Sequence, residues 1–192
     1  MAGTQHTGAR NLTVLTGLWL LVCAVMPALI TEITTRAVIV PEGGDIIMTQ
    51  REAVNDAWDL PREATYEPFF ERHPDMAQFT QPVEGFEWRW YYAFQQVGDQ
   101  TAEALSQAYT DGRKRRGTLA SRLSLISPAG FVQQRLERWA DTDMRAALDY
   151  EAEIRDFHKT LRIYYYPRLF DGRAYEVSEV ETRPVFQAQH RH

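Results

Sequence analysis

The sequence contains little cysteine and little lysine. It therefore has few residues that could cross-link the fold or form a broad basic surface. Its one cysteine, Cys23, excludes an intramolecular disulfide framework and a zinc site built from cysteines. Of its 21 basic residues, only Lys114 and Lys159 are lysines. With a formal net charge of −5 and a pI near 5.6, the chain lacks the basic surface that neutralises phosphates, so we expect no nucleic-acid partner.

Sequence motifs for common enzymatic chemistry are also absent. There is no Gly-x-x-x-x-Gly-Lys-Ser/Thr loop, no Gly-x-Gly-x-x-Gly turn and no Gly-x-Ser-x-Gly elbow. No histidine stands in a His-Glu-x-x-His or Glu-x-x-His arrangement. The histidines are His6, His73, His158, His190 and His192. We therefore predict no catalytic residue, no cofactor site, no metal site and no enzymatic activity for this chain.

The clusters of charged residues are also interpreted as having no catalytic role. The carboxylate pairs Glu84 with Glu87 and Glu151 with Glu153 are taken as solvated faces, because nothing in the sequence separates their pKa values into an acid and a base. The basic run Arg113–Arg116 is also interpreted as a solvated helix face. A patch for lipid headgroups or for targeting is its alternative.

A long apolar run lies near the N-terminus. No charge occurs between Arg10 and Glu32, and a helix over residues 12–30 would be about 28 Å long, close to the ~30 Å hydrocarbon core of a bilayer. We predict a transmembrane helix there. A signal peptide cleaved near residues 22–24, a lipoprotein signal and a buried core helix stay open as alternatives. Since Arg10 and Arg36 flank opposite ends, the basic residues leave the orientation undecided.

Turn and capping residues predict an all-α fold, with one N-terminal transmembrane helix followed by an antiparallel bundle of long helices. Asp45 is the expected cap of a first helix that ends before Pro61. One long helix is predicted from residue 84 to 126, loosened at Gly112 and Gly117. The predicted division is an N-terminal tail at 1–11, the transmembrane helix at 12–30, a linker at 31–44, a helical domain at 45–186 and a C-terminal tail at 187–192.

Two further helix starts are predicted in the second half of the chain. Ser127 is expected to cap a helix that begins at Pro128, since proline is favoured at the first helical position. Asp141 or Thr142 is expected to cap the last helix.

Aromatic residues are dense in two segments, the cluster Phe86 to Phe94 and the run Tyr164–Tyr166. The cluster contains Phe86, Trp88, Trp90, Tyr91, Tyr92 and Phe94. Core packing between the two segments is the favoured interpretation. An interfacial membrane belt is the alternative, because tryptophan and tyrosine favour the headgroup level.

The sequence also resembles a bacterial family along residues 12–186. The resemblance lies in Leu-Trp-Leu-Leu and Met-Pro-Ala-Leu within the apolar run, and in QREAVNDAWDLP, EPFFERHPD, EGFEWRWYYAFQQVGDQ, SPAGFVQQRLERWADTD and DFHKTLRIYYYPRLF. These strings resemble the extracytoplasmic region of ABC transporter permease subunits of the type-2 exporter class, a region described as a domain of unknown function.

The resemblance implies a location and partners but no catalytic residue. The helical domain would be extracytoplasmic, on the periplasmic side of the inner (cytoplasmic) membrane. Membrane lipid, a separate ABC ATPase subunit and other permease spans would be its partners. A whole permease should have several spans, whereas one is visible here, so a fragment, a split gene product and a single-span protein stay open. A secreted or membrane-anchored helical binding protein independent of a transporter is the alternative.

Overall fold

The structure is a computed structural model that describes residues 3–79, 87–171 and 176–188. All regular structure in these ranges is helical, so the predicted all-α fold, with a long apolar N-terminal helix before a helical bundle, is confirmed. The elements are α1 (Gly3–Leu20), the π-helical turn η1 (Leu21–Val25), α2 (Met26–Ala37), α3 (Gly43–Trp58), α4 (Arg62–Arg72), the 3₁₀ helix η2 (Pro74–Phe79), α5 (Trp88–Thr101), α6 (Glu103–Leu123), the 3₁₀ turn η3 (Ser124–Ile126), α7 (Pro128–Trp139), α8 (Met144–Asp171) and α9 (Val177–Glu181).

The chain forms two compact units. Met1–Val40 and Thr110–Asp149 make up the first unit, and Pro41–Tyr109 and Tyr150–His190 make up the second. The chain therefore passes from one unit to the other within α6 and again within α8. The residues predicted as a linker, 31–44, are helical except at Val38–Glu42.

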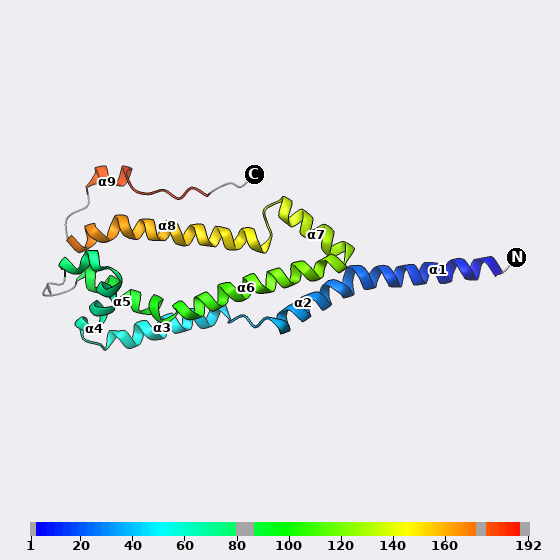
Figure 1. Cartoon of the computed structure of the whole chain (residues 1–192), viewed down its shortest axis with the longest axis horizontal. Coiled ribbons are helices and arrows are strands. Elements are labelled where there is room, and N and C mark those ends of the chain that lie inside the picture. The colour runs from blue at the N-terminus through cyan, green and yellow to red at the C-terminus, as the bar shows by residue number, and fades with distance from the viewer. Residues whose placement is uncertain (1–2, 80–86, 172–175, 189–192) are drawn as a thin grey trace. The chain divides into compact units, whose positions relative to one another are not determined.

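In the first unit, α1, η1 and α2 follow one another as a continuous helix (Figure 1). Gly112 and Arg116 of α6 lie against the residues that follow α2. Arg116 donates a hydrogen bond from Nη2 to the Val38 carbonyl over 2.9 Å. A Cβ on Gly112 would lie 2.9 Å from Cγ2 of Val40.

The prediction that Gly112 and Gly117 loosen a long helix is wrong. The helix over residues 88–123 is interrupted at Ala102, and α6 runs through both glycines. Each glycine instead makes room for a neighbour, because a Cβ on Gly117 would lie 3.0 Å from Cγ of Met144. Because glycine has no side chain, Val40 and Met144 can pack closely against α6 at these two positions.

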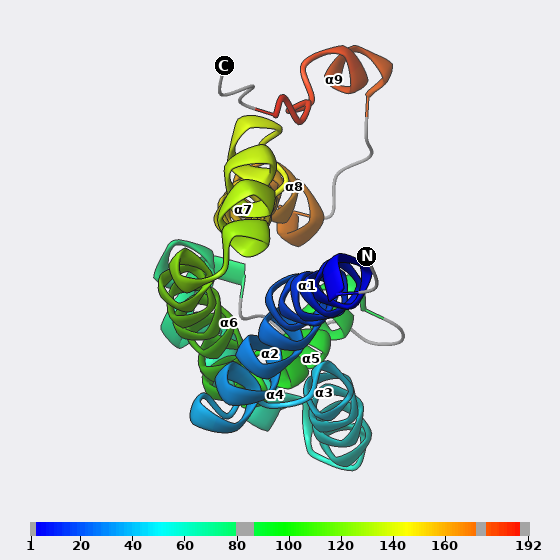
Figure 2. The same cartoon turned by 90° about the vertical axis from the view of Figure 1, so that its right-hand side faces the viewer.

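In the second unit, α3 and α5 lie side by side (Figure 1, Figure 2). They approach each other closely at Gly98 of α5, where a Cβ would lie 2.7 Å from Cγ2 of Val54 and 2.8 Å from the Gln50 carbonyl oxygen. The helix α4 also packs on α5. One buried group of this core is Phe69, Met76, Ala93 and Phe170, and a second is Ala57, Trp90 and Phe94.

The predicted caps are correct in one of three places. Ser127 caps α7 as predicted, since its Oγ accepts a hydrogen bond from the Gly130 N–H over 3.3 Å. The helix α3 begins earlier than predicted, with Glu42 rather than Asp45 at the N-cap position. At the start of α8, Asp143 replaces the predicted Asp141 or Thr142, because Oδ1 of Asp143 accepts from the Ala146 N–H over 2.8 Å.

Candidate functional site

The N-terminal helix changes its hydrogen-bond register in the middle of its apolar run. In the π-helical turn Leu21–Val25, the Met26 N–H donates to the Leu21 carbonyl, five residues back. The residue at the same spacing from Val22 is Pro27, which has no N–H to donate. The helix in this register therefore offers no backbone donor to the Val22 carbonyl.

Ser127 supplies that missing donor from another part of the first unit. Its Oγ donates to the Val22 carbonyl over 3.2 Å, while the same oxygen accepts from the Gly130 N–H. The Ser127 side chain has no exposed surface. The Ser127 hydroxyl thus caps α7 and also gives the Val22 carbonyl of the apolar helix a hydrogen-bond donor.

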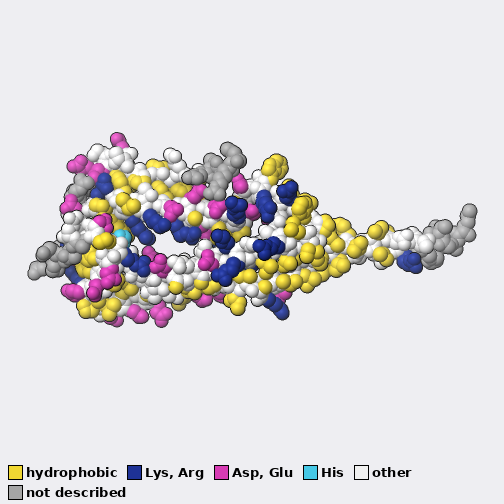
Figure 3. Space-filling view, in the orientation of Figure 1, with side chains coloured by type: hydrophobic (Ala, Val, Ile, Leu, Met, Phe, Trp, Pro, Cys, Tyr) yellow, Lys and Arg dark blue, Asp and Glu magenta, His cyan; other side chains and the backbone are white. Residues whose placement is uncertain are grey.

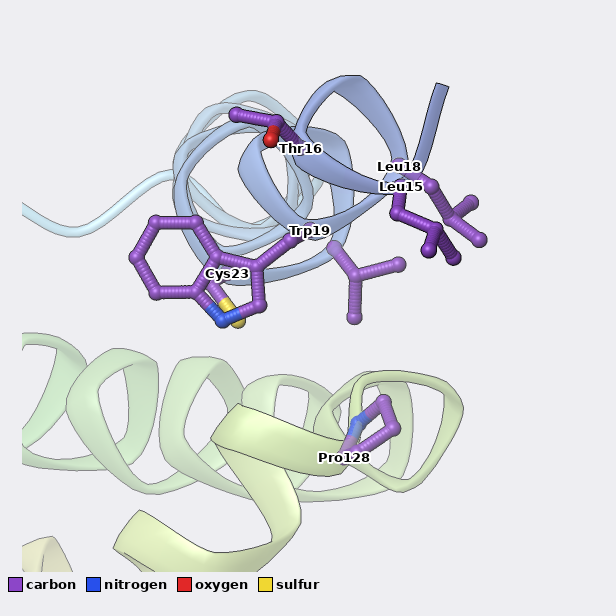
Figure 4. Close-up of a pocket in the computed structure, with 7 residues that line it drawn as sticks. Leu15, Thr16, Leu18, Trp19, Cys23 and Pro128 are labelled. Atoms are coloured by element: carbon purple, nitrogen blue, oxygen red, sulfur yellow. The ribbon is translucent and has the colours of Figure 1, made fainter. Parts of the chain in front are cut away.

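Around this contact, the apolar helix is exposed on most sides. Figure 3 shows hydrophobic side chains gathered over α1 and the neighbouring start of α7. An open hollow of about 620 Å³ lies here, lined by Leu15, Thr16, Leu18, Trp19, Val22, Cys23 and Pro128. Trp19 and Cys23 face it from the N-terminal helix and Pro128 from α7 (Figure 4). The lining is almost entirely apolar, which suits a lipid chain or an apolar side chain.

The helix from Thr7 to Ala37 is long and apolar enough to cross a membrane, judged by length and composition. It extends beyond the predicted span of residues 12–30 at both ends. A signal sequence near the N-terminus would have the same properties.

The aromatic cluster packs in the core of the second unit, as favoured from the sequence. The Tyr92 and Tyr166 rings are 6.0 Å apart, which joins the cluster to the tyrosine run. Trp90 and Phe94 stack at 5.2 Å. Trp88 and Tyr92 are exposed, and Phe86 lies outside the described residues.

Of the two histidines whose side chains the structure describes, His73 packs in this core. Its ring centroid lies 4.7 Å from that of Phe69 and 5.5 Å from that of Tyr166, and its Nε2 lies 3.2 Å from Nε2 of Gln96. Burial lowers the pKa of His73, against the opposing charge of Asp75. The neutral ring is therefore the form that the folded unit favours.

The prediction of a solvated face is wrong for Glu87. This residue is buried at the N-cap of α5, and its carboxylate forms an ion pair with the guanidinium of Arg89. Burial raises the pKa of Tyr66, with further contributions from a hydrogen bond to Glu87 and from its negative charge. The guanidinium of Arg62 lies 5.4 Å from the Trp90 ring centroid. The two side chains of the ion pair have little exposed surface, which suits a structural role.

The other residues singled out from the sequence do not gather into a site. His158 is exposed, while the side chains of His6, His190, His192 and Glu84 lie outside the described part of the chain. Among described residues, no group of three or more His, Cys, Asp or Glu side chains is placed to hold a metal. In the basic run Arg113–Arg116, Lys114 and Arg115 are exposed, and a headgroup or targeting role there stays a prediction.

One protein family matches most of the chain. Residues 46–189 match the family described as a domain of unknown function (DUF3526). The chain belongs to the DUF3526 family. No curated protein and no solved structure matches the chain.

The DUF3526 region begins at Ile46 in α3 and includes α4 to α9, so it leaves the apolar helix outside. The Ser127 to Val22 hydrogen bond therefore joins the DUF3526 region to the preceding helix. The hydrogen bond between Ser127 and Val22 was not predicted from the sequence. The available signal was Pro27 inside an apolar helix, which indicates a carbonyl without a backbone donor but not which residue supplies one.

Proposed function

We propose that this chain is the membrane-anchored, non-enzymatic portion of an ABC exporter permease. In this proposal the apolar helix spans the inner membrane, and the helical region that follows acts on the periplasmic side as an interaction or gating module. ATP hydrolysis belongs to a separate ATPase subunit, and other permease spans and membrane lipid are the remaining partners. The single observation that supports it best is the exposed apolar surface of α1, η1 and α2.

That surface is too large to be left in water. The exposed large apolar side chains between residues 12 and 30 are Leu12, Val14, Leu15, Leu18, Trp19, Leu20, Leu21, Val25 and Leu29. Transferring such a set from water to an apolar environment is worth on the order of 10 kcal/mol, taking ~1.5–3 kcal/mol for each fully transferred side chain and allowing for partial exposure. Lipid and the apolar faces of neighbouring spans are the environments that recover this energy.

The assignment to an exporter rests on the sequence resemblance. The strings that carry it extend from the apolar helix through α8, so they include both the proposed span and the proposed external module. The description of DUF3526 names no activity.

The topology is tested by protease digestion of spheroplasts that express the full chain with a C-terminal tag. We expect external protease to remove the C-terminal tag and to spare an N-terminal tag on a matched protein. A cytoplasmic marker protein controls for lysis. A protected C-terminal tag would contradict the proposed orientation.

A charge within the span gives a second test of membrane anchoring. Leu18→Arg should move a large share of the chain from the membrane fraction to the soluble or degraded fraction, since a central arginine costs about 2.5–3.5 kcal/mol in insertion. Ile39→Arg is the matched control, because Ile39 is 88% exposed and lies beyond the apolar helix. Equal fractionation of the two variants would argue against a span at residues 12–30.

The transporter assignment is tested by purification from detergent. Recovery of an ATPase and of multi-span subunits with the tagged chain is the expected result. Recovery of a lone chain from the aqueous phase would favour the alternative, a helical binding protein independent of a transporter. That alternative places its ligand in a groove lined by the aromatic cluster, whereas the hollow at the apolar helix and a second one between α3 and α5 are lined by other residues.

A further inference from the structure

The helix α7 has an apolar face that no part of the first unit covers fully. Phe131, Val132, Leu136 and Trp139 fall within an arc of about 140°, at 100° per residue, and the opposite arc carries Gln133 and other polar residues. All four apolar side chains are exposed, as are Leu125 and Ile126 in the preceding turn η3. Arg135 also falls within this arc, so the face is apolar apart from one arginine. An exposed apolar face of this kind marks an interaction surface.

The position of this face is fixed by the contact at Ser127. Its hydroxyl bonds to the Val22 carbonyl, and Val22 lies twelve residues beyond Arg10 in the sequence, about 18 Å along the helix. If Arg10 lies near one surface of the bilayer, Val22 lies within its ~30 Å hydrocarbon core. Pro128 lines the same apolar hollow as Leu15 and Trp19 (Figure 4), so the two apolar surfaces are continuous.

Ser127, at the break between η3 and α7, meets the requirement that a hydrocarbon environment sets for irregular backbone. Such backbone is tolerated at membrane depth only where it is buried in protein and fully hydrogen-bonded. The Ser127 N–H donates to the Ser124 carbonyl over 3.1 Å, and the Ser127 carbonyl accepts from the Phe131 N–H over 2.8 Å. With its hydroxyl also bonded twice, Ser127 has a partner for every polar group.

Arginine on α7 is compatible with a bilayer surface. The guanidinium of Arg135 lies 5.7 Å from the Phe131 ring centroid, on the apolar side of the helix. Its long stem can cover apolar surface while the charged end reaches phosphate headgroups.

We propose that η3 and α7 enter the bilayer beside the spanning helix and that lipid acyl chains cover the apolar face of α7. This inference rests on the proposed function, in which the apolar helix spans the membrane. Lipid is the occupant we assign because the face of α7 continues the exposed surface of the span. A second copy of the chain or another permease span would have to displace lipid from both surfaces together.

The test uses the full chain in vesicles of phosphatidylcholine and phosphatidylglycerol. With Cys23→Ser as the background, single cysteines are introduced by Val132→Cys, by Gln133→Cys as the matched control on the polar face, and by Leu15→Cys as a reporter of the span. Each is spin-labelled, and its collision rates with oxygen and with a water-soluble nickel chelate are compared. Helix content of every variant is checked by circular dichroism before labelling.

We expect labels at positions 132 and 15 to favour oxygen over the nickel chelate several-fold more than the label at position 133. A water-exposed label at 132 with a lipid-exposed label at 15 would overturn this inference and leave the proposed span intact. A water-exposed label at 15 would overturn the span itself, and this inference with it. A label at 132 that neither reagent reaches would overturn lipid as the occupant and indicate a protein neighbour.

Discussion

Replacing Gly98 by alanine tests a close contact between α3 and α5 in the second unit. The new methyl group would lie 2.7 Å from Cγ2 of Val54 and 2.8 Å from the Gln50 carbonyl oxygen. Valine in a helix has one strongly preferred rotamer, and the carbonyl belongs to the backbone of α3, so neither neighbour yields without moving the helix. Overpacking of this kind costs about 1–3 kcal/mol.

The substitution also has a favourable term, which sets the net expectation. Alanine is better than glycine in a helix interior by about 1 kcal/mol, so Gly98→Ala should lower the free energy of unfolding by up to about 2 kcal/mol. Gly44→Ala is the matched control in the same unit. A Cβ on Gly44 meets nothing within 4 Å, so this variant should be unchanged or stabilised by up to ~1 kcal/mol.

The assay is urea unfolding of the full chain in a mild detergent, followed by tryptophan fluorescence. Three of the five tryptophans, Trp58, Trp88 and Trp90, belong to the second unit, while Trp19 and Trp139 belong to the first. The assay therefore uses Trp19→Phe and Trp139→Phe as the background, so that fluorescence reports on the second unit. If Gly98→Ala gains stability as Gly44→Ala does, α3 and α5 do not approach each other at Gly98, and the reasoning is refuted.

Three further predictions concern the cores and the cap. Phe69 is fully buried and stacks on Phe170 at 4.9 Å, so Phe69→Ala should cost about 3–5 kcal/mol in the same urea assay; a loss below about 1 kcal/mol would contradict this packing. Because burial lowers the pKa of His73, the unfolded chain binds more protons just below the ordinary histidine value of 6.5, and stability should fall as the pH falls through that range. His73→Gln should reduce this fall and His158→Gln should preserve it; equal curves would show that His73 is not its source. Ser127→Ala should lower the thermal stability of the full chain by about 1–2 kcal/mol, and Ser127→Thr should restore part of it; failure of threonine to do so would argue against the hydroxyl.

Local chemistry made much of the helical pattern predictable. Pro128 after a serine predicts a helix start without reference to the rest of the chain, and Ser127 caps α7 as expected. The apolar run likewise predicts a long N-terminal helix. These features depend on a few adjacent residues, so sequence alone contains the information.

Features that depend on distant residues were not predictable in this way. Gly112 and Gly117 suggest a weak helix when only local propensity is considered, but their neighbours Val40 and Met144 turn them into packing sites. Glu87 suggests a solvated residue until its burial and its pairing with the half-buried Arg89 are known. In each case, tertiary contacts decide the outcome.

The hydrogen bond between Ser127 and Val22 makes substitutions at two distant positions interdependent. Pro27 removes the N–H that could serve the Val22 carbonyl, and Ser127 provides the replacement. A residue with an N–H at position 27 would make the hydroxyl at 127 less necessary, so a double-mutant cycle on these two sites should show non-additive energies. The DUF3526 match begins at residue 46, so a protein cut at that boundary would lose one half of this coupled pair.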